Sequence, residues 1–410
     1  MNINDEFITK VIRLNNEGKG VSIINGVVTF IDKALVNETL KVKIDKINKN
    51  YMEASIIQII EESKDRIKPI CPYYNKCGGC NLMHMSSETI LSFKKDKVKN
   101  IFKKISNEEI NIDKIYSYNE LNYRNKVVFK VKEDKIGFYK NKSNELIDID
   151  YCFICDELIN KVLKVIKVFI KENINHNIKE IMIRTCNSKI MLSLDNLNSD
   201  LKDKFIKKFN IIDSIYINNT LVYGSKNIIQ TLNNFNFYVS EKSFFQVNIK
   251  TIEKLYDYAL SKVCDSKTLL DLYSGTGTIS ILSSNKSKKV IGIEVIPSAV
   301  KDANENLKLN NIKNVKFILG KVEDNIEKIK KENVDYLILD PPRSGSDKKS
   351  LKNILEINPK KIIYISCNPV TLARDYNSLK NKYHIEDITL FDMFPNTHHV
   401  ESLMVLERKN

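Results

Sequence analysis

Hydrophobic and polar positions form two kinds of pattern along the chain, and the first is confined to residues 1–62. Short apolar runs alternate there with turn residues, as in VSIINGVVTF (21–30), where Asn25-Gly26 separates two runs. This dipeptide accepts positive φ at both turn positions and predicts a β-hairpin. With the later runs LKVKID and YMEASIIQII, about five strands are expected, which favours a small β-barrel. The pattern alone does not separate an RNA-binding barrel from one without a ligand.

The second pattern begins near residue 240, where apolar runs alternate with helical periodicity. The runs are TLLDLYSG, KVIGIEV, NVKFILG, VDYLILD and KIIYISC. Such alternation predicts an α/β fold with a doubly wound parallel sheet. The segment between holds a cysteine cluster, a lysine-rich helix and paired strands in YRNKVVFKVKEDKIGFYKN. We therefore predict three domains, at residues 1–62, 63–238 and 239–410.

Composition narrows the setting of these domains. Lys and Arg number 65 against 51 Asp and Glu, a net charge of +14, which favours a polyanionic partner but also fits a general lysine bias. No apolar run approaches the length of a membrane span, and MNINDEFITK has no signal-peptide character. We expect a cytoplasmic protein without membrane contact.

The run LLDLYSGTGTISI predicts a strand, a glycine turn and a helix start. Gly275 and Gly277 let the backbone approach a ligand, but Ser280 replaces the third glycine of a dinucleotide fingerprint. The next strand ends in Glu294, whose carboxylate suits the hydroxyls of a ribose. Asp340 ends a later strand in DPPR, at the edge where such sheets bind ligands, although a rigid surface turn is the alternative. Together these features resemble an S-adenosylmethionine-dependent methyltransferase.

Arg343 and Cys367 indicate which atom is methylated. Amine methyltransferases resemble Asp-Pro-Pro followed by an aromatic residue that stacks on the base, whereas Arg343 stands here. Carbon 5 of uracil must be activated before methylation, and a thiolate that adds to carbon 6 does this. A base must then remove the carbon 5 proton. Cys367, at the end of a strand, is the candidate nucleophile, with a buried structural thiol as the alternative; Glu401, His398 or His399 is the candidate base.

These stretches resemble the RNA uridine-5 methyltransferase family over nearly the whole chain. The resemblance rests on SFFQVN, DLYSGTGTIS, DPPRSG, SCNP and HHVES. It implies that Cys367 is the nucleophile and Glu401 the base. It also implies that S-adenosylmethionine is bound by four residues: Gln246, Tyr273, Glu294 and Asp340.

The cysteines of CPYYNKCGGC predict a metal site. Cys71, Cys77 and Cys80 have C-x5-C-x2-C spacing, and a fourth ligand is expected from Cys152 or Cys155. Spacing alone allows zinc or an iron–sulfur cluster. The family resemblance favours Cys152 and implies a [4Fe-4S] cluster with a structural or RNA-positioning role.

The barrel resembles the TRAM RNA-binding module, and Arg124 lies in a stretch similar to one that the family uses on RNA. A TRAM module with a cysteine cluster is more typical of ribosomal RNA enzymes, so we predict 23S rRNA as the substrate and 5-methyluridine as the product. The alternatives are a tRNA enzyme of the same chemistry and a non-catalytic iron–sulfur RNA-binding protein. Nothing in the sequence indicates an obligate oligomer, so a monomer is expected.

Overall fold

The N-terminal strands form a closed sheet around a small apolar core. The computed structural model describes residues 1–141, 143–329 and 332–409, apart from the side chains of residues 326–328. In spatial order the barrel strands are β1 (Glu6–Lys10), β5 (Thr39–Ile47), β6 (Met52–Glu61), β4 (Val27–Ile31), β3 (Gly20–Ile24) and β2 (Arg13–Leu14). Ile12 donates its backbone N–H to the Val21 carbonyl at 2.9 Å, so the chain leaving β1 pairs with β3 and closes the sheet.

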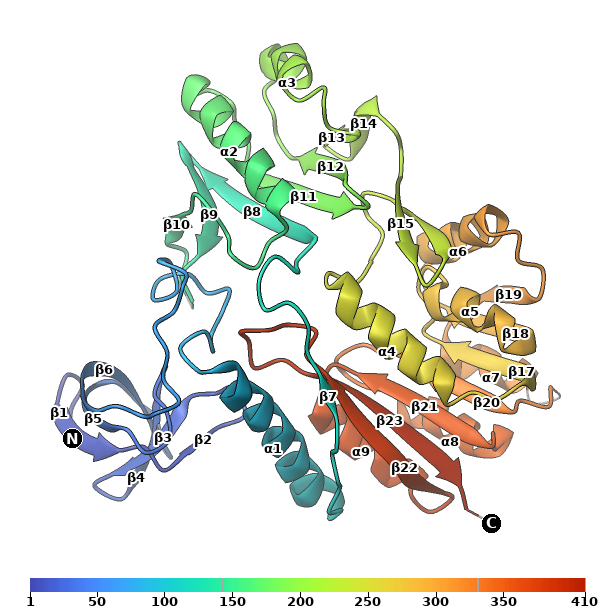
Figure 1. Cartoon of the computed structure of the whole chain (residues 1–410), viewed down its shortest axis with the longest axis horizontal. Helices are drawn as coiled ribbons and strands as arrows, with labels where there is room; N and C mark the ends of the chain where they lie inside the picture. The colour runs from blue at the N-terminus through green and yellow to red at the C-terminus, as the bar shows by residue number, and fades with distance from the viewer. Residues whose placement is uncertain (142, 330–331, 410) are drawn as a thin grey trace. The chain divides into compact units, whose positions relative to one another are not determined.

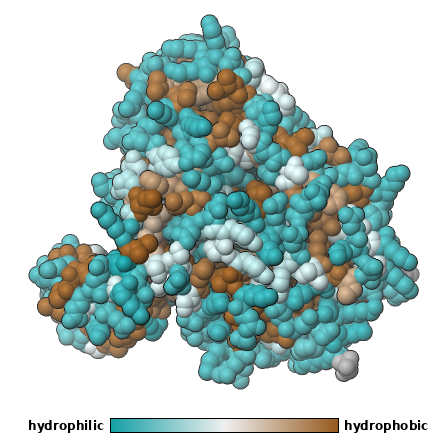
Figure 2. All heavy atoms as spheres, viewed as in Figure 1, coloured by the Kyte–Doolittle hydropathy of each residue, from teal (hydrophilic) through white to brown (hydrophobic). Residues whose placement is uncertain are grey.

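The predicted hairpin is confirmed. β3 pairs with β4 around Asn25 and Gly26, which have φ values of 49° and 80°. The turn therefore has positive φ at both central residues, as a tight hairpin requires. Exposed isoleucines lie on the outside of the barrel, and Figure 2 shows apolar surface on this part of the molecule. They include Ile8, Ile12, Ile23, Ile57 and Ile60.

The described chain forms two compact units. The first comprises residues 1–97, 140–143 and 396–399, and the second contains the other described residues. Helix α1 (Ser87–Ser106) is divided between them at Lys97. The domain boundaries predicted at residues 62 and 238 stay a prediction. No helix of the described residues is long and apolar enough to cross a membrane.

The second unit begins with a mixed sheet that supports a long helix. Its spatial order is β10 (Leu146–Asp148), β9 (Lys135–Tyr139), β8 (Lys126–Lys132), β11 (Glu180–Cys186), β12 (Lys189–Leu194), β13 (Ser214–Ile217) and β14 (Thr220–Gly224). The helices α2 (Glu157–Glu172) and α3 (Lys202–Lys208) and the hairpin β15 (Ile228–Leu232) and β16 (Phe235–Val239) complete this part. Ile159, Leu163, Ile166 and Ile170 form the buried stripe of α2, at helical spacing.

The C-terminal sheet has the doubly wound order predicted from the sequence. Its spatial order is β19 (Val315–Leu319), β18 (Ser287–Glu294), β17 (Ser266–Leu272), β20 (Tyr336–Leu339), β21 (Lys361–Ser366), β23 (Glu401–Arg408), β22 (Tyr383–Phe391) and β7 (Ile115–Tyr116). β17 to β21 are parallel, but β23 is antiparallel to both of its neighbours. A nine-residue connection (392–400) without a helix returns the chain from β22, so the last strand must reverse direction. β7 was not predicted, because two residues carry no periodicity.

Helices cover both faces of this sheet (Figure 1). On one face are α4 (Ile249–Ser261), α5 (Thr278–Leu282) and α6 (Pro297–Leu309); on the other are the end of α1 and α7 (Val322–Ile329), α8 (Lys348–Ile357) and α9 (Pro369–Leu379). Neighbouring strand residues divide between the two cores, as Leu269 and Leu270 do. Burial on both faces explains why the strands are continuous apolar runs.

Candidate active site

Three predicted residues lie side by side where the parallel strands end. The registers of β17 with β18 and with β20 place Tyr273 between Glu294 and Asp340. β17 is also the point at which the strand order reverses. In open α/β sheets this reversal opens a crevice at the carboxyl ends of the strands, where ligands bind.

The glycine turn after β17 brings backbone to the surface of this crevice. Tyr273, Gly275 and Gly277 all have positive φ, at 64°, 55° and 82°. A Cβ atom at Gly277 would lie 2.5 Å from the Phe317 ring, whereas one at Gly275 would meet nothing within 4 Å. Gly277 is thus required for packing, and Gly275 leaves an open approach for a ligand. A non-glycine residue at positive φ, as at Tyr273, is strain of the kind found at functional sites.

Glu294 is fixed by the turn that it faces. Its Oε2 accepts a hydrogen bond from the Gly275 N–H at 2.9 Å, and its Oε1 accepts one from the Ile296 N–H at 2.8 Å. Each carboxylate oxygen retains a further acceptor position. The geometry therefore presents two oriented acceptors to a neighbouring diol.

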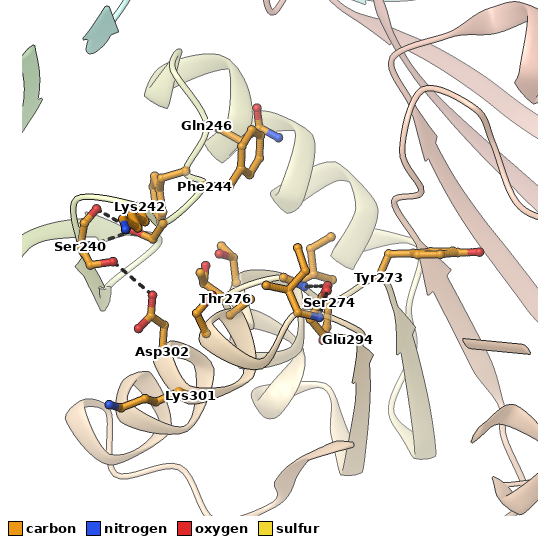
Figure 3. Close-up of a pocket in the computed structure, with 18 of the residues that line it drawn as sticks. Ser240, Lys242, Phe244, Gln246, Tyr273, Ser274, Thr276, Glu294, Lys301 and Asp302 are labelled. Carbon is orange, nitrogen blue, oxygen red and sulfur yellow. Dashed lines mark hydrogen bonds between the residues drawn. The ribbon is translucent and has the colours of Figure 1, made fainter. Parts of the chain in front are cut away.

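All four residues predicted to bind the cofactor line one cavity of about 790 Å³: Gln246, Tyr273, Glu294 and Asp340. Figure 3 shows Glu294 and Thr276 at this cavity, with the side chain of Tyr273 directed away from them. Tyr273 thus lines the cavity with its backbone, which has a positive φ of 64°. The volume is in the range of small-molecule sites, and the acceptors at Glu294 fit the ribose of S-adenosylmethionine. The hydroxyl of Ser274 is buried without a hydrogen-bond partner among the described residues, so it is available to a ligand.

Cys367 and Glu401 lie at the same edge, on adjacent strands. Ser366 at the end of β21 pairs with Ser402 on β23, so Cys367 and Glu401 are the next residues beyond this pair. Cys367 is half-buried, and Glu401 is 8% exposed. The fold therefore places Cys367 next to Glu401, the two residues for which the family resemblance implies the roles of nucleophile and base.

The electrostatics of this pair are unusual. Burial, with the carboxyl groups of Glu401 and Asp340 nearby, raises the pKa of the Cys367 thiol to about 11, against the opposing effect of Arg343. Burial and Asp340 raise the pKa of Glu401 to about 8, and burial raises the pKa of Asp340 to about 7. The site thus holds more negative groups than it can ionise together, and it favours a cation.

A fourth acid of the site, Asp271, lies inside β17 and was not predicted from the sequence. Its Oδ2 accepts a hydrogen bond from the Ser280 hydroxyl at 2.5 Å, and its Oδ1 has no partner among the described residues. Burial raises the pKa of Asp271 to about 7, with Asp340 acting in the same direction. An acid within the apolar run TLLDL was the available signal.

Two buried polar residues support the loop that carries Gln246, and neither was predicted. Arg184, which is 1% exposed, donates hydrogen bonds to the carbonyls of Ser240 and Ser243, both at 2.8 Å. Asn125 donates its side-chain amide to the Gln246 carbonyl at 3.4 Å. These contacts join segments far apart in the sequence, so no local pattern could reveal them.

The alternative bases are the histidines of HHVES, and the structure describes their contacts within the first unit. His398 and His399 belong to the first unit, where their ring centroids lie 4.2 Å apart with the ring planes tilted by 39°. The Nδ1 atom of His398 is 2.7 Å from the side-chain amide of Asn81. The structure thus gives His398 a contact with the cysteine loop and gives Cys367 a neighbour in Glu401.

The predicted metal ligands are divided between the two compact units. Cys71, Cys77 and Cys80 are half-buried in the first unit, whereas Cys152 belongs to the second. Among residues 1–141, 143–329 and 332–409 no group of three or more His, Cys, Asp or Glu side chains is placed to hold a metal ion. Cys152 is half-buried and Cys155 fully buried.

Arg124 is half-buried, and its Nε donates to the Lys126 carbonyl at 3.0 Å. Its backbone pairs with the loop of Cys155. Burial, with Arg184 as a neighbour, lowers the pKa of Lys126 to about 8. This stretch is therefore built into the fold, and an RNA contact by Arg124 stays a prediction.

Comparison with known proteins gives consistent results. Residues 86–409 match the family model described as tRNA (uracil-5-)-methyltransferase. The chain is 35% identical to an RNA methyltransferase of Caldanaerobacter subterraneus subsp. tengcongensis, over 99% of both proteins. It is 36% identical to one of Clostridium acetobutylicum, over 99% of this chain and 97% of that protein.

Among solved structures, the fold is similar to that of the Pyrococcus abyssi tRNA (uracil-54, C5)-methyltransferase in complex with S-adenosyl-L-homocysteine. The TM-score is 0.80 at 24% identity, over 98% of this chain and all of the other.

Proposed function

We propose that this chain, which belongs to the tRNA (uracil-5-)-methyltransferase family, converts a uridine of 23S rRNA to 5-methyluridine. Its activity is that of an S-adenosylmethionine-dependent RNA uracil-5-methyltransferase. The proposed reaction proceeds through a covalent adduct between Cys367 and the uracil ring. The observation that carries the chemistry is the register of β21 with β23, from which Cys367 and Glu401 follow as neighbours. The four residues proposed to bind the cofactor all line the same cavity: Gln246, Tyr273, Glu294 and Asp340.

In the proposed reaction the Cys367 sulfur bonds to carbon 6 of uracil, and the carbon 5–carbon 6 π electrons move into the ring enolate. S-adenosylmethionine, when bound, would supply the electrophilic methyl group for carbon 5, with the methyl–sulfur bond breaking and S-adenosylhomocysteine as the leaving group. Glu401 then accepts the carbon 5 proton, the double bond re-forms, and the carbon 6–sulfur bond breaks to release the thiolate. One nucleophile and one base suffice for this sequence of steps.

The pKa shifts bear on how these groups are charged. A carboxyl with a pKa of about 8 gains and loses its proton near neutral pH, which is the property of an efficient general base. The thiol, at about 11, is protonated at neutral pH and needs positive charge nearby to ionise. Arg343 acts in this direction on both Cys367 and Glu401.

The choice of 23S rRNA is supported by the barrel and the cysteine cluster, which together are more typical of ribosomal RNA enzymes. The second candidate is tRNA, which the name of the Pyrococcus abyssi protein favours.

The chain itself would act as a cytoplasmic monomer. Size-exclusion chromatography with and without RNA tests the oligomeric state.

The substrate is tested with anaerobically purified protein, S-adenosylmethionine and unmodified 23S or tRNA transcripts. Nucleosides from digested RNA are identified by mass spectrometry. 5-Methyluridine from 23S RNA alone supports the proposal, and the same product from tRNA alone replaces the substrate but keeps the chemistry. If neither RNA is methylated, or if Cys367→Ala is as active as wild type, the proposed catalysis is wrong and the non-catalytic alternative is favoured.

We further propose that Cys71, Cys77, Cys80 and Cys152 hold a [4Fe-4S] cluster. Thiolates are the ligands of such clusters, and Cys152 is more exposed than Cys155. The measurement is iron and acid-labile sulfide in anaerobic protein, with Cys→Ser variants at each position. Loss of iron with Cys152→Ser but not Cys155→Ser is expected, and exposed Cys264→Ser is the control. Zinc without sulfide would overturn the assignment.

A further inference from the structure

The helix that follows Cys367 is fastened to the loop that follows Asp340. α9 is capped by Asn368, whose side-chain amide donates to the Arg343 carbonyl at 3.0 Å. Thr371, one turn into the helix, donates to the same carbonyl at 3.4 Å. The backbone that carries Arg343 is therefore bonded to the helix start next to Cys367.

Asp375 lies at the centre of this junction and is 1% exposed. Its Oδ2 accepts hydrogen bonds from the Tyr364 hydroxyl at 2.6 Å and the Ser346 N–H at 2.8 Å. Its Oδ1 accepts from Nε and Nη2 of Arg374 at 2.8 and 2.6 Å. One carboxylate thus ties together β21, α9 and the Arg343 loop.

The loop is shaped to reach this carboxylate. Gly345 has φ of +78°, and a Cβ atom there would lie 2.6 Å from the Asp375 Oδ2 and 2.5 Å from the Arg374 Nη2. Arg374 also donates to the Ser344 carbonyl at 2.9 Å. A residue larger than glycine would separate the loop from the helix.

We propose that Asp375 is a positioning residue of the methylation reaction. Its carboxylate holds the loop of Arg343 against α9, the helix that follows Cys367. The Arg343 guanidinium and the Cys367 thiol thereby keep a fixed separation. The inference rests on the proposed function, because it requires Cys367 to be the nucleophile. It gives a role to Arg374 and Asp375, which the reaction itself does not use. A small displacement of a reacting group lowers the reaction rate strongly, so loss of the Asp375 hydrogen bonds should slow the reaction.

The test uses Asp375→Asn, which places an amide where Arg374 needs an acceptor. The measurement is the single-turnover rate at which Cys367 forms an adduct with 5-fluorouridine RNA, since fluorine at carbon 5 prevents release. We expect this rate to fall about 10-fold to 100-fold with unchanged affinity for S-adenosylmethionine. Arg374→Ala, at a half-exposed side chain, should act in the same direction with a smaller effect.

A double-mutant cycle separates positioning from general stability. Because Asp375 acts through Arg343, Arg343→Ala/Asp375→Asn should react no more slowly than Arg343→Ala alone. The matched control is Asp335→Asn, which loses an ion pair with Lys360 (2.9 Å) at the other end of β20 and should react as wild type. Additive effects, or lost cofactor affinity in Asp375→Asn, would overturn the inference. Absence of adduct in the wild type would instead count against the proposed function.

Discussion

The two halves of the site satisfy their charged groups in opposite ways. At the cofactor half, Glu294 has a backbone N–H on each oxygen, from Gly275 and Ile296. At the reacting half, Glu401 and Cys367 are desolvated beside Asp340, and burial raises the pKa of all three. The hydrogen bonds of Glu294 are therefore formed before a ligand binds. The negative charge of the reacting half is compensated only when a positively charged group binds there. This contrast predicts different consequences for mutations in each half.

The largest effect is expected from Cys367→Ala. Removal of the nucleophile leaves carbon 5 without activation, so methyl transfer should fall by at least about 10³-fold. S-Adenosylmethionine affinity should stay near that of wild type, as isothermal titration would show. A variant that binds the cofactor poorly would contradict the separation of the halves.

Glu401→Gln should reduce turnover by about 10² to 10⁴-fold, as loss of a general base does. It should also stabilise the ligand-free protein, and more so at high pH. Because the folded pKa of about 8 exceeds the usual 4.5, stability is lost as pH rises through 8, when the buried carboxyl ionises. Glutamine removes this cost, so the variant should melt several degrees above wild type at pH 9 and close to it at pH 5, by calorimetry. An equal difference at both pH values would contradict the burial of the charge.

Glu294→Gln sharpens the comparison from the other half. The amide keeps the shape but cannot accept from both backbone N–H groups, and it loses charge-assisted bonds to the ribose. We expect cofactor affinity to fall about 10-fold to 100-fold with a smaller change in the rate of the bound enzyme. A large fall in the single-turnover rate at saturating cofactor would show that the two halves are not separable.

The smallest effect concerns the thiol itself. S-Adenosylmethionine carries a sulfonium cation that S-adenosylhomocysteine lacks, so only the former should lower the pKa of Cys367. The rate at which iodoacetamide modifies the tryptic peptide Ile362–Arg374 should report this shift against pH. Identical profiles with the two ligands would contradict the account of the reacting half.

The sequence predicted the parts of this site that follow from strand ends. An acid or a cysteine at the end of a buried parallel strand must lie at the carboxyl edge of the sheet. Glu294, Asp340 and Cys367 all stand at such strand ends. Arg184 and Asp375 were not predicted, because their roles come from contacts with segments that adopt their position only in the folded chain. β7 joins the sheet through two residues, which is too few for a periodic signal.

The most direct test of the central claim maps the covalent adduct in the Glu401→Gln variant. Without the base, the carbon 5 proton stays in place and the adduct of methylated RNA with protein should accumulate. After incubation with 23S RNA and S-adenosylmethionine, nuclease and trypsin digestion and mass spectrometry should find methylated uridine on Cys367. Release of 5-methyluridine RNA at the wild-type rate, or an adduct on another cysteine, would contradict the roles given to Cys367 and Glu401.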